Sequence, residues 1–147
     1  MLTKGSKAPA FSAPSTLGTV HLQESLGKKR IVLIFYPKDN TPVCTKQLCA
    51  ARDSRKQYES AGAEVYGVNP GSLEDHQAFA DKHGYDFPLI SDTDGRIRQL
   101  YDVGKIFGLF GQQRLVYAIE KDGTIVFAQK GNPSTSDILA AFQTTPA

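Results

Sequence analysis

Residues 30–49 read RIVLIFYPKDNTPVCTKQLC, an apolar run that changes abruptly into polar sequence with two prolines. The β-branched and aromatic side chains at its start are typical of a central strand covered on both faces of a sheet. Pro37 ends this strand. Thr41 is a good helix N-cap, and Pro42 falls at the first helical position, where proline is favoured. The stretch therefore predicts a buried strand, a short loop and a helix that runs to about Ser60.

The protein has two cysteines, Cys44 and Cys49, and both lie in this predicted helix. Cys44 is its third residue, where backbone N–H groups and the helix dipole stabilise a thiolate nucleophile. In an ideal helix Cys49 lies ~7.5 Å further along and ~140° around the axis, whereas a disulfide needs Cα atoms roughly 4.4–6.8 Å apart. A disulfide between them therefore requires the first turns to unwind, which indicates an element with two states.

Two questions about this helix stay open from the residues alone. Thr41 lies one turn before Cys44, and its hydroxyl can bond the backbone N–H of Cys44, the thiolate or a substrate. A cysteine can also be a small buried hydrophobic residue without chemistry. That alternative weighs more for Cys49, which lies between Leu48 and Ala50.

The composition is that of an ordinary globular protein. The 147 residues suit a single domain, 1–147, and the net charge of +2 is too small to indicate a nucleic-acid partner. No run approaches the ~18 apolar residues of a membrane span, and the first residues lack a signal-peptide core, so we expect a cytoplasmic protein. Two cysteines are not a disulfide framework, and no cluster has the spacing of a metal site.

The rest of the chain alternates between strand and helix patterns. We expect strands at 64–68, 87–91, 115–119 and 124–128, helices at 72–83, 94–101 and 136–142, and a short hairpin within the arm 1–29. Asp122 and Gly123 mark a hairpin between the last two strands. This order predicts an α/β fold with a central mixed sheet flanked by helices, which is the layout of a thioredoxin-like fold.

Pro37-x-x-x-Thr41-x-x-Cys44 resembles the active-site signature of the peroxiredoxins. The run from Phe35 to Thr45, followed by Cys49, is similar to the Q-type branch, also called bacterioferritin co-migratory protein. Three further segments resemble that branch, at 76–84, 87–92 and 114–123. The chain departs from the branch at Val43, where glycine is common, and in the loop 69–72.

The resemblance implies a role for each matched residue. Cys44 attacks a hydroperoxide, either hydrogen peroxide or an organic one, and becomes a sulfenic acid. Thr41 bonds the thiolate and the peroxide, Pro37 shields the sulfur from water, and Arg114 supplies a cation. Cys49 then attacks the sulfenic acid and forms a disulfide, which a thioredoxin-type dithiol reduces. The family implies an antioxidant enzyme that needs no cofactor and occurs as a monomer or weak homodimer.

Two other hypotheses for the pair of cysteines lead to different functions. A redox-sensing binding protein would use the same unwinding to alter a partner interface, and would be oxidised only stoichiometrically. A dithiol–disulfide oxidoreductase would reduce protein disulfides, but Cys-x₄-Cys does not place both sulfurs at one helix end as Cys-x-x-Cys does.

Several residues outside the signature have simpler explanations. We expect His76 and His83 to be solvated residues on a helix surface, too far apart to hold one metal. Arg52 and Arg55 are further candidates for a thiolate partner, but their distance along the helix favours ordinary surface arginines. The glycine-rich apolar segment 103–111 either covers the core or forms part of the peroxide pocket, a dimer contact or a docking surface.

Overall fold

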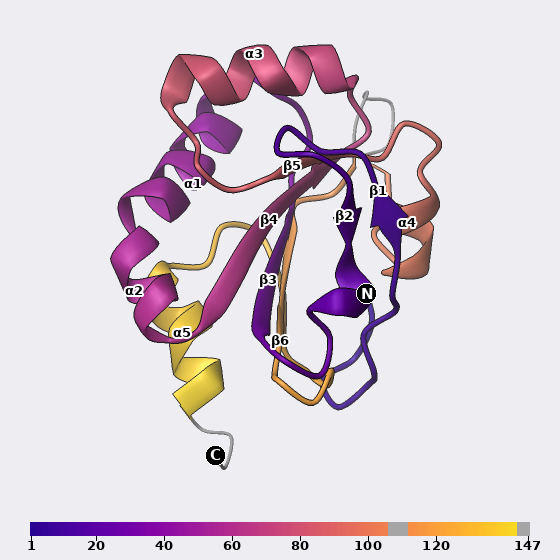
Figure 1. Ribbon diagram of the computed structural model, residues 1–147, viewed down its shortest axis with the longest axis vertical. Helices are drawn as coiled ribbons and strands as arrows, with labels where there is room; N and C mark the ends of the chain where they lie inside the picture. Colours follow the sequence, from indigo (N-terminus) through magenta and orange to yellow (C-terminus); the bar gives the residue numbers. More distant parts are fainter. Residues whose placement is uncertain (106–111, 144–147) are drawn as a thin grey trace.

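The computed structural model describes residues 1–105 and 112–143. Its centre is a five-stranded sheet with the strand order β5-β4-β3-β6-β7 (Figure 1). The strands are β1 Ser12–Ala13, β2 Val20–His21, β3 Arg30–Phe35, β4 Ala63–Asn69, β5 Leu89–Ser91, β6 Leu115–Ile119 and β7 Ile125–Lys130. The helices are α1 Pro42–Asp53, α2 Arg55–Ser60, α3 Leu73–His83, α4 Arg96–Leu100 and α5 Thr135–Gln143, and a 3-10 turn covers Leu22–Glu24.

The sheet is mixed, as the sequence predicts. The central strand β3 runs parallel to β4, which runs parallel to β5. On its other side β3 pairs antiparallel with β6, and β6 with β7. The expected N-terminal hairpin is the separate antiparallel pair β1 and β2.

The predicted helix from Thr41 to Ser60 is wrong in one respect, because it is divided in two. Ser54 leaves the helical conformation (φ −94°, ψ 13°) between α1 and α2. Its hydroxyl lies 2.9 Å from the hydroxyl of Thr135 on α5. The side chain of Ser54 therefore takes part in a tertiary hydrogen bond. Serine is a residue type whose hydroxyl readily bonds groups outside the helical pattern. The break between α1 and α2 therefore lies where the chain contacts α5.

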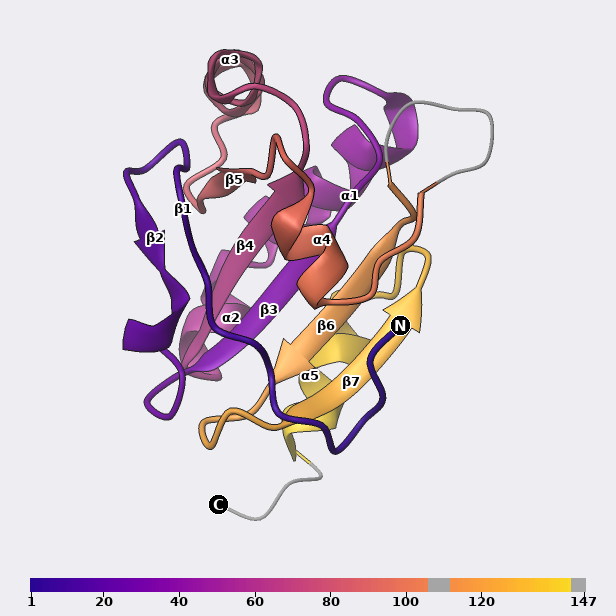
Figure 2. The same cartoon turned by 90° about the vertical axis from the view of Figure 1, so that its right-hand side faces the viewer.

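Two hydrophobic clusters cover the two faces of the sheet. One packs α1, α2, α3 and α5 against one face, and its fully buried members include Val32, Leu48, Phe79 and Val116. The other joins the opposite face to α4 and the N-terminal arm. Figure 2 shows α4 in front of the sheet and α1, α2 and α5 behind it. Strand β3 is buried on both faces, as its apolar sequence predicts.

Among the described residues, no helix combines the length and apolar character that crossing a bilayer requires.

Among the glycines of the described residues, Gly67 on β4 has the closest neighbours. A Cβ there would lie 2.7 Å from Leu89 Cδ2 and 3.2 Å from Tyr36 Cε1. Both neighbours are fully buried, so neither has free space to move into. We therefore expect Gly67→Ala to lower the free energy of unfolding by about 1–3 kcal/mol, the usual cost of overpacking a core. Urea denaturation measures this, and the exposed substitution Gln129→Ala should change it by less than about 0.5 kcal/mol.

Candidate active site

The strand-to-helix junction places Cys44 in the first turn of α1. Thr41 occupies the N-cap position with extended backbone angles (φ −85°, ψ 149°), and Pro42 is the first helical residue. Asn40 adopts a left-handed conformation (φ 61°), which turns the chain from β3 into the helix. Cys44 is fully buried in the first hydrophobic cluster. Its sulfur therefore lies near the positive end of the helix dipole and out of bulk water.

Arg114 contacts the sulfur of Cys44. Its Nη2 donates to Cys44 Sγ at 3.1 Å, and its Nη1 donates to Gln47 Oε1 at 2.7 Å. Gln47 is itself buried, one helical turn after Cys44 on the same side of α1. The guanidinium is therefore held by two side chains of one helix face and directs an N–H at the sulfur. This is a charge-assisted geometry suited to a thiolate.

Sheet pairing explains why Arg114 reaches a helix 67 to 70 residues away in sequence. Leu115 at the start of β6 pairs with Phe35 at the end of β3. The residue before β6 therefore lies beside the loop that leads into α1. The backbone carbonyl of Arg114 also accepts a hydrogen bond from Gly131 at 3.0 Å, which secures the main chain there.

The hydroxyl of Thr41 bonds neither the backbone N–H nor the sulfur of Cys44 in this structure. It donates to the carbonyl of Lys38 at 2.9 Å, within the loop itself. The turn at Asn40 brings this carbonyl into reach of the hydroxyl. Pro37 is half-buried two residues after the end of β3, at the other end of the same loop.

The two cysteines are both free thiols in an intact helix. Cys44 is buried, whereas Cys49 is partly exposed. Cys49 Sγ lies 3.3 Å from the hydroxyl of Tyr85, a residue that follows α3. The structure therefore does not bring Cys49 to Cys44. It shows the folded state of the helix, from which a disulfide would require unwinding.

The expectation that His76 is a solvated surface residue is wrong. Its side chain is fully buried, with Nδ1 2.5 Å from Asp39 Oδ2 and Nε2 3.2 Å from the carbonyl of Asn69. His76, Phe79 and Ala80 are all buried and share one face of α3, at the i, i+3 and i+4 positions. That spacing was the available sequence signal. His83 is half-buried and stacks on the ring of Tyr85.

His76 belongs to a polar group that anchors the loop before α1. The hydroxyl of Tyr36 donates to Asp39 Oδ1 at 2.7 Å, so the carboxylate of Asp39 joins the end of β3 to α3. Asn69 and Gln112 both donate to the carbonyl of Tyr36. Burial and the Asp39 carboxylate raise the pKa of Tyr36 well above its usual value, so this phenol remains a donor. Sequence reasoning missed this network because its members lie on separate elements.

The other two arginine candidates are engaged elsewhere. Arg52 donates to the carbonyl of His83 at 2.6 Å and to Asp53 at 3.0 Å. Arg55 lies between Glu59 and Asp86, with Nε 2.8 and 3.0 Å from their carboxylates. Both are ordinary structural arginines, as the sequence favoured.

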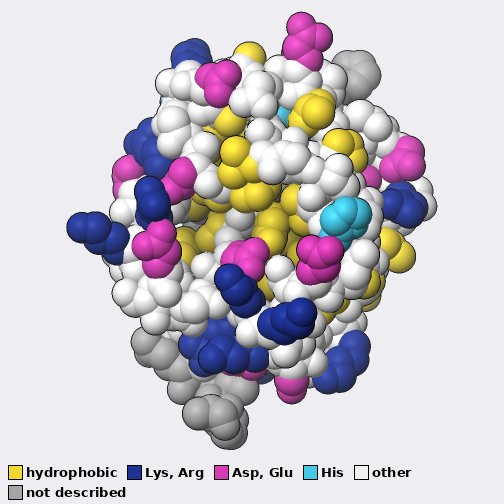
Figure 3. Space-filling view, viewed as in Figure 1, with side chains coloured by type: hydrophobic (Ala, Val, Ile, Leu, Met, Phe, Trp, Pro, Cys, Tyr) yellow, Lys and Arg dark blue, Asp and Glu magenta, His cyan; other side chains and the backbone are white. Residues whose placement is uncertain are grey.

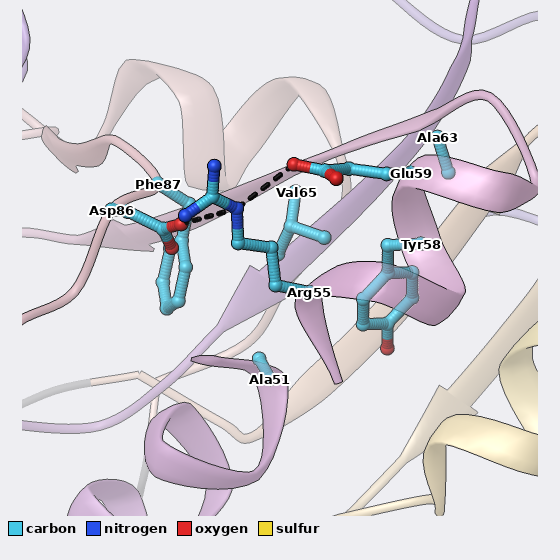
Figure 4. Close-up of a pocket in the computed structure, with 8 residues that line it drawn as sticks. All are labelled: Ala51, Arg55, Tyr58, Glu59, Ala63, Val65, Asp86 and Phe87. Carbon is cyan, nitrogen blue, oxygen red and sulfur yellow. Dashed lines mark hydrogen bonds and ion pairs between the residues drawn. The ribbon is translucent and has the colours of Figure 1, made fainter. Parts of the chain in front are cut away.

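Arg55 lines a pocket that is separate from the thiols. Figure 4 shows it reaching across the pocket between Asp86 and Glu59, with apolar side chains beneath. The lining residues are Ala51, Arg55, Tyr58, Glu59, Ala63, Val65, Asp86 and Phe87. Figure 3 shows that hydrophobic side chains gather in a hollow on one face of the molecule, with charged side chains around it. Neither cysteine lines the pocket of Figure 4.

The glycine-rich segment 103–111 is only partly described. Val103 is buried in the second hydrophobic cluster, but residues 106–111 lie outside the described residues. Its role therefore stays a prediction. Within the described part of the chain, no group of three or more His, Cys, Asp or Glu side chains is placed to hold a metal ion.

A family model and two similar sequences that match this chain belong to the peroxiredoxins or their wider family. The AhpC/TSA family model matches residues 4–128. A chloroplastic peroxiredoxin Q from Sedum lineare is 41% identical over 126 residues, which cover 84% of this chain and 67% of the relative. A putative peroxiredoxin bcp from Coxiella burnetii is 36% identical over 126 residues, which cover 82% and 83% of the two chains.

Solved structures show the same likeness. The crystal structure of peroxidoxin BcpB from Mycobacterium tuberculosis superimposes with a TM-score of 0.90 at 25% identity, over 100% of both chains. The bacterioferritin comigratory protein of Xanthomonas campestris gives a TM-score of 0.81 at 28% identity, over 90% of both chains. The fold is therefore thioredoxin-like, as the sequence predicts. With matches in both sequence and structure, the chain belongs to the AhpC/TSA family, in the branch of the peroxiredoxin Q and Bcp proteins.

Proposed function

We propose that this peroxiredoxin reduces hydroperoxides with Cys44 as the attacking thiolate. The observation that carries the assignment is the 3.1 Å contact between Arg114 Nη2 and the buried sulfur of Cys44 at a helix N-terminus. A buried charge is costly unless it is paired, and here a fixed cation is the partner. The same guanidinium is placed to stabilise negative charge that develops on the peroxide oxygens.

In the first step the Cys44 thiolate attacks the terminal oxygen of ROOH. A sulfur–oxygen bond forms as the oxygen–oxygen bond breaks, and the leaving alkoxide takes up a proton to give ROH. Cys44 is oxidised to the sulfenic acid and the peroxide is reduced by two electrons. Thr41 contributes when its hydroxyl leaves the Lys38 carbonyl and bonds the thiolate or the peroxide, while Pro37 limits the access of water.

In the second step α1 unwinds locally and the Cys49 thiolate attacks the sulfenic sulfur. A disulfide forms, and the hydroxide that leaves is protonated to water. An external dithiol of the thioredoxin type then restores both thiols by exchange. The cycle therefore draws on two cysteines and a reductant, without a metal or organic cofactor.

The setting of this activity is also a proposal. We infer a single-domain cytoplasmic antioxidant enzyme that acts as a monomer or weak homodimer on hydrogen peroxide and organic hydroperoxides. The small net charge of +2 supports a protein without nucleic-acid or membrane partners. Relatives named peroxiredoxin Q and Bcp support the peroxide substrate and the thioredoxin-type reductant.

Replacement of the nucleophile tests the chemistry most directly. We expect Cys44→Ser to abolish peroxide turnover, with a loss of at least about 100-fold, because a serine hydroxyl is a weak nucleophile at neutral pH. The measurement is consumption of hydrogen peroxide coupled to a thioredoxin system. Substantial residual turnover would assign the nucleophile elsewhere. Wild-type protein that is oxidised once and does not turn over would instead indicate a redox sensor.

Replacement of the second cysteine separates the two steps. We expect Cys49→Ser to reduce one equivalent of peroxide at the wild-type rate and then to stop, because no thiol of the chain can resolve the sulfenic acid. Mass spectrometry should show the sulfenic acid, followed by sulfinic acid as more peroxide is added. Normal cycling of this variant with thioredoxin would disprove the resolving role of Cys49.

Removal of the cation should weaken the first step. We expect Arg114→Ala to slow peroxide reduction by about 10²–10³-fold, the usual cost of losing one donor to a developing charge. Stopped-flow kinetics with hydrogen peroxide measures the rate of this step. Arg55→Ala, which removes an arginine remote from Cys44, is the matched control, and an Arg114→Ala rate equal to that of this control would refute the assignment.

A further inference from the structure

Tyr85 touches the helix turn that must open during the proposed cycle. Its hydroxyl lies 3.3 Å from Cys49 Sγ and also donates to the carbonyl of Thr45 at 3.3 Å. In an α-helix the carbonyl of residue 45 accepts the N–H of residue 49. A single hydroxyl therefore contacts both ends of one helical turn, 45–49, together with the side chain of Cys49.

The ring that carries this hydroxyl is held on three sides. It stacks on Phe87 at 5.3 Å between centroids and on His83 at 5.5 Å, and its face-to-edge contact with Phe79 measures 5.2 Å. Gly84 immediately before it has the left-handed conformation (φ 66°) that ends α3 and turns the chain toward α1. The hydroxyl is thus presented from a rigid aromatic group, and little conformational entropy is lost when it bonds the helix.

The hydroxyl of Tyr85 can form a hydrogen bond with Cys49 whether Cys49 is a thiol or a thiolate. Burial and the neighbouring Cys49 sulfur raise the pKa of Tyr85, so the phenol keeps its proton. With Cys49 as a thiol, the S–H can donate to the phenol oxygen while the O–H donates to Thr45. With Cys49 as a thiolate, the O–H can donate to the sulfur. In either state the contact holds Cys49 on the side of α1 that faces α3.

We propose that Tyr85 is a positioning residue that keeps the turn 45–49 helical and Cys49 apart from Cys44, and so slows formation of the disulfide between them. This inference rests on the proposed function, because it concerns the resolving step of that cycle. Opening the turn breaks whichever contact the hydroxyl makes with Thr45 or Cys49. Tyr85 therefore sets how fast the disulfide forms, and so how the sulfenic acid divides between Cys49 and a second peroxide.

The test is Tyr85→Phe, which keeps the ring and removes only the hydroxyl. We expect peroxide reduction at the wild-type rate and disulfide formation about 2- to 10-fold faster, the range that one lost hydrogen bond supports. Full-length protein receives one equivalent of hydrogen peroxide, is quenched with an alkylating reagent at set times, and is analysed by mass spectrometry. At higher peroxide, the fraction of sulfinic acid per turnover should fall by a similar factor.

Tyr58→Phe is the matched control. Tyr58 lies on α2 in the same hydrophobic cluster, but its hydroxyl bonds Thr135 rather than the turn 45–49. It should leave disulfide formation unchanged, although it removes one buried phenol hydroxyl. Tyr85→Leu, which removes the hydroxyl together with the ring contacts, should accelerate disulfide formation at least as much as Tyr85→Phe.

The outcomes separate this inference from the proposed function. Wild-type protein that forms no disulfide between Cys44 and Cys49 would overturn both. Wild-type protein that forms it, with Tyr85→Phe at the same or a slower rate, would overturn only the role of Tyr85. Equal acceleration by Tyr58→Phe would also overturn it, because general loosening of the core would then explain the effect.

Discussion

The contact between Arg114 and the sulfur of Cys44 depends on the pairing of β3 with β6, and the rest of the site is arranged around it. A thiolate in a fully buried position has lost its hydration, so it needs a fixed cation or donor nearby. The helix N-terminus alone supplies a partial charge. The guanidinium supplies a full one, held in place by Gln47. Strand pairing, helix start and side-chain burial thus converge on one sulfur atom.

The same helix serves two opposed requirements. While α1 is intact, it places Cys44 at the helix N-terminus and keeps Cys49 away from it. The proposed disulfide needs the reverse, a turn that is open. The loop before α1 is anchored by Asp39 and His76, which fixes the end of the helix that carries Cys44. Side chains from outside the helix contact the turn 45–49, Arg114 at Gln47 and Tyr85 at Thr45.

Much of the fold could be predicted, because it follows from local patterns. The apolar run of β3 and the N-cap at Thr41 both appear where the sequence indicates them. The failures have tertiary causes. Ser54, at the break between α1 and α2, bonds Thr135 of α5, and the buried His76 bonds the carboxylate of Asp39. Neither partner is close in sequence.

What the sequence by itself determined is the nature of the chemistry: two thiols in one helix, one at its N-terminus, with a spacing that an intact helix cannot bridge. These properties depend on residues that are neighbours along the chain. Only the tertiary structure decided which charge meets the sulfur, where the Thr41 hydroxyl points, and what holds the turn between the cysteines. Those contacts join β6, the loop after β3 and the residue after α3 to α1, and their distances are set by sheet register and packing rather than by local sequence.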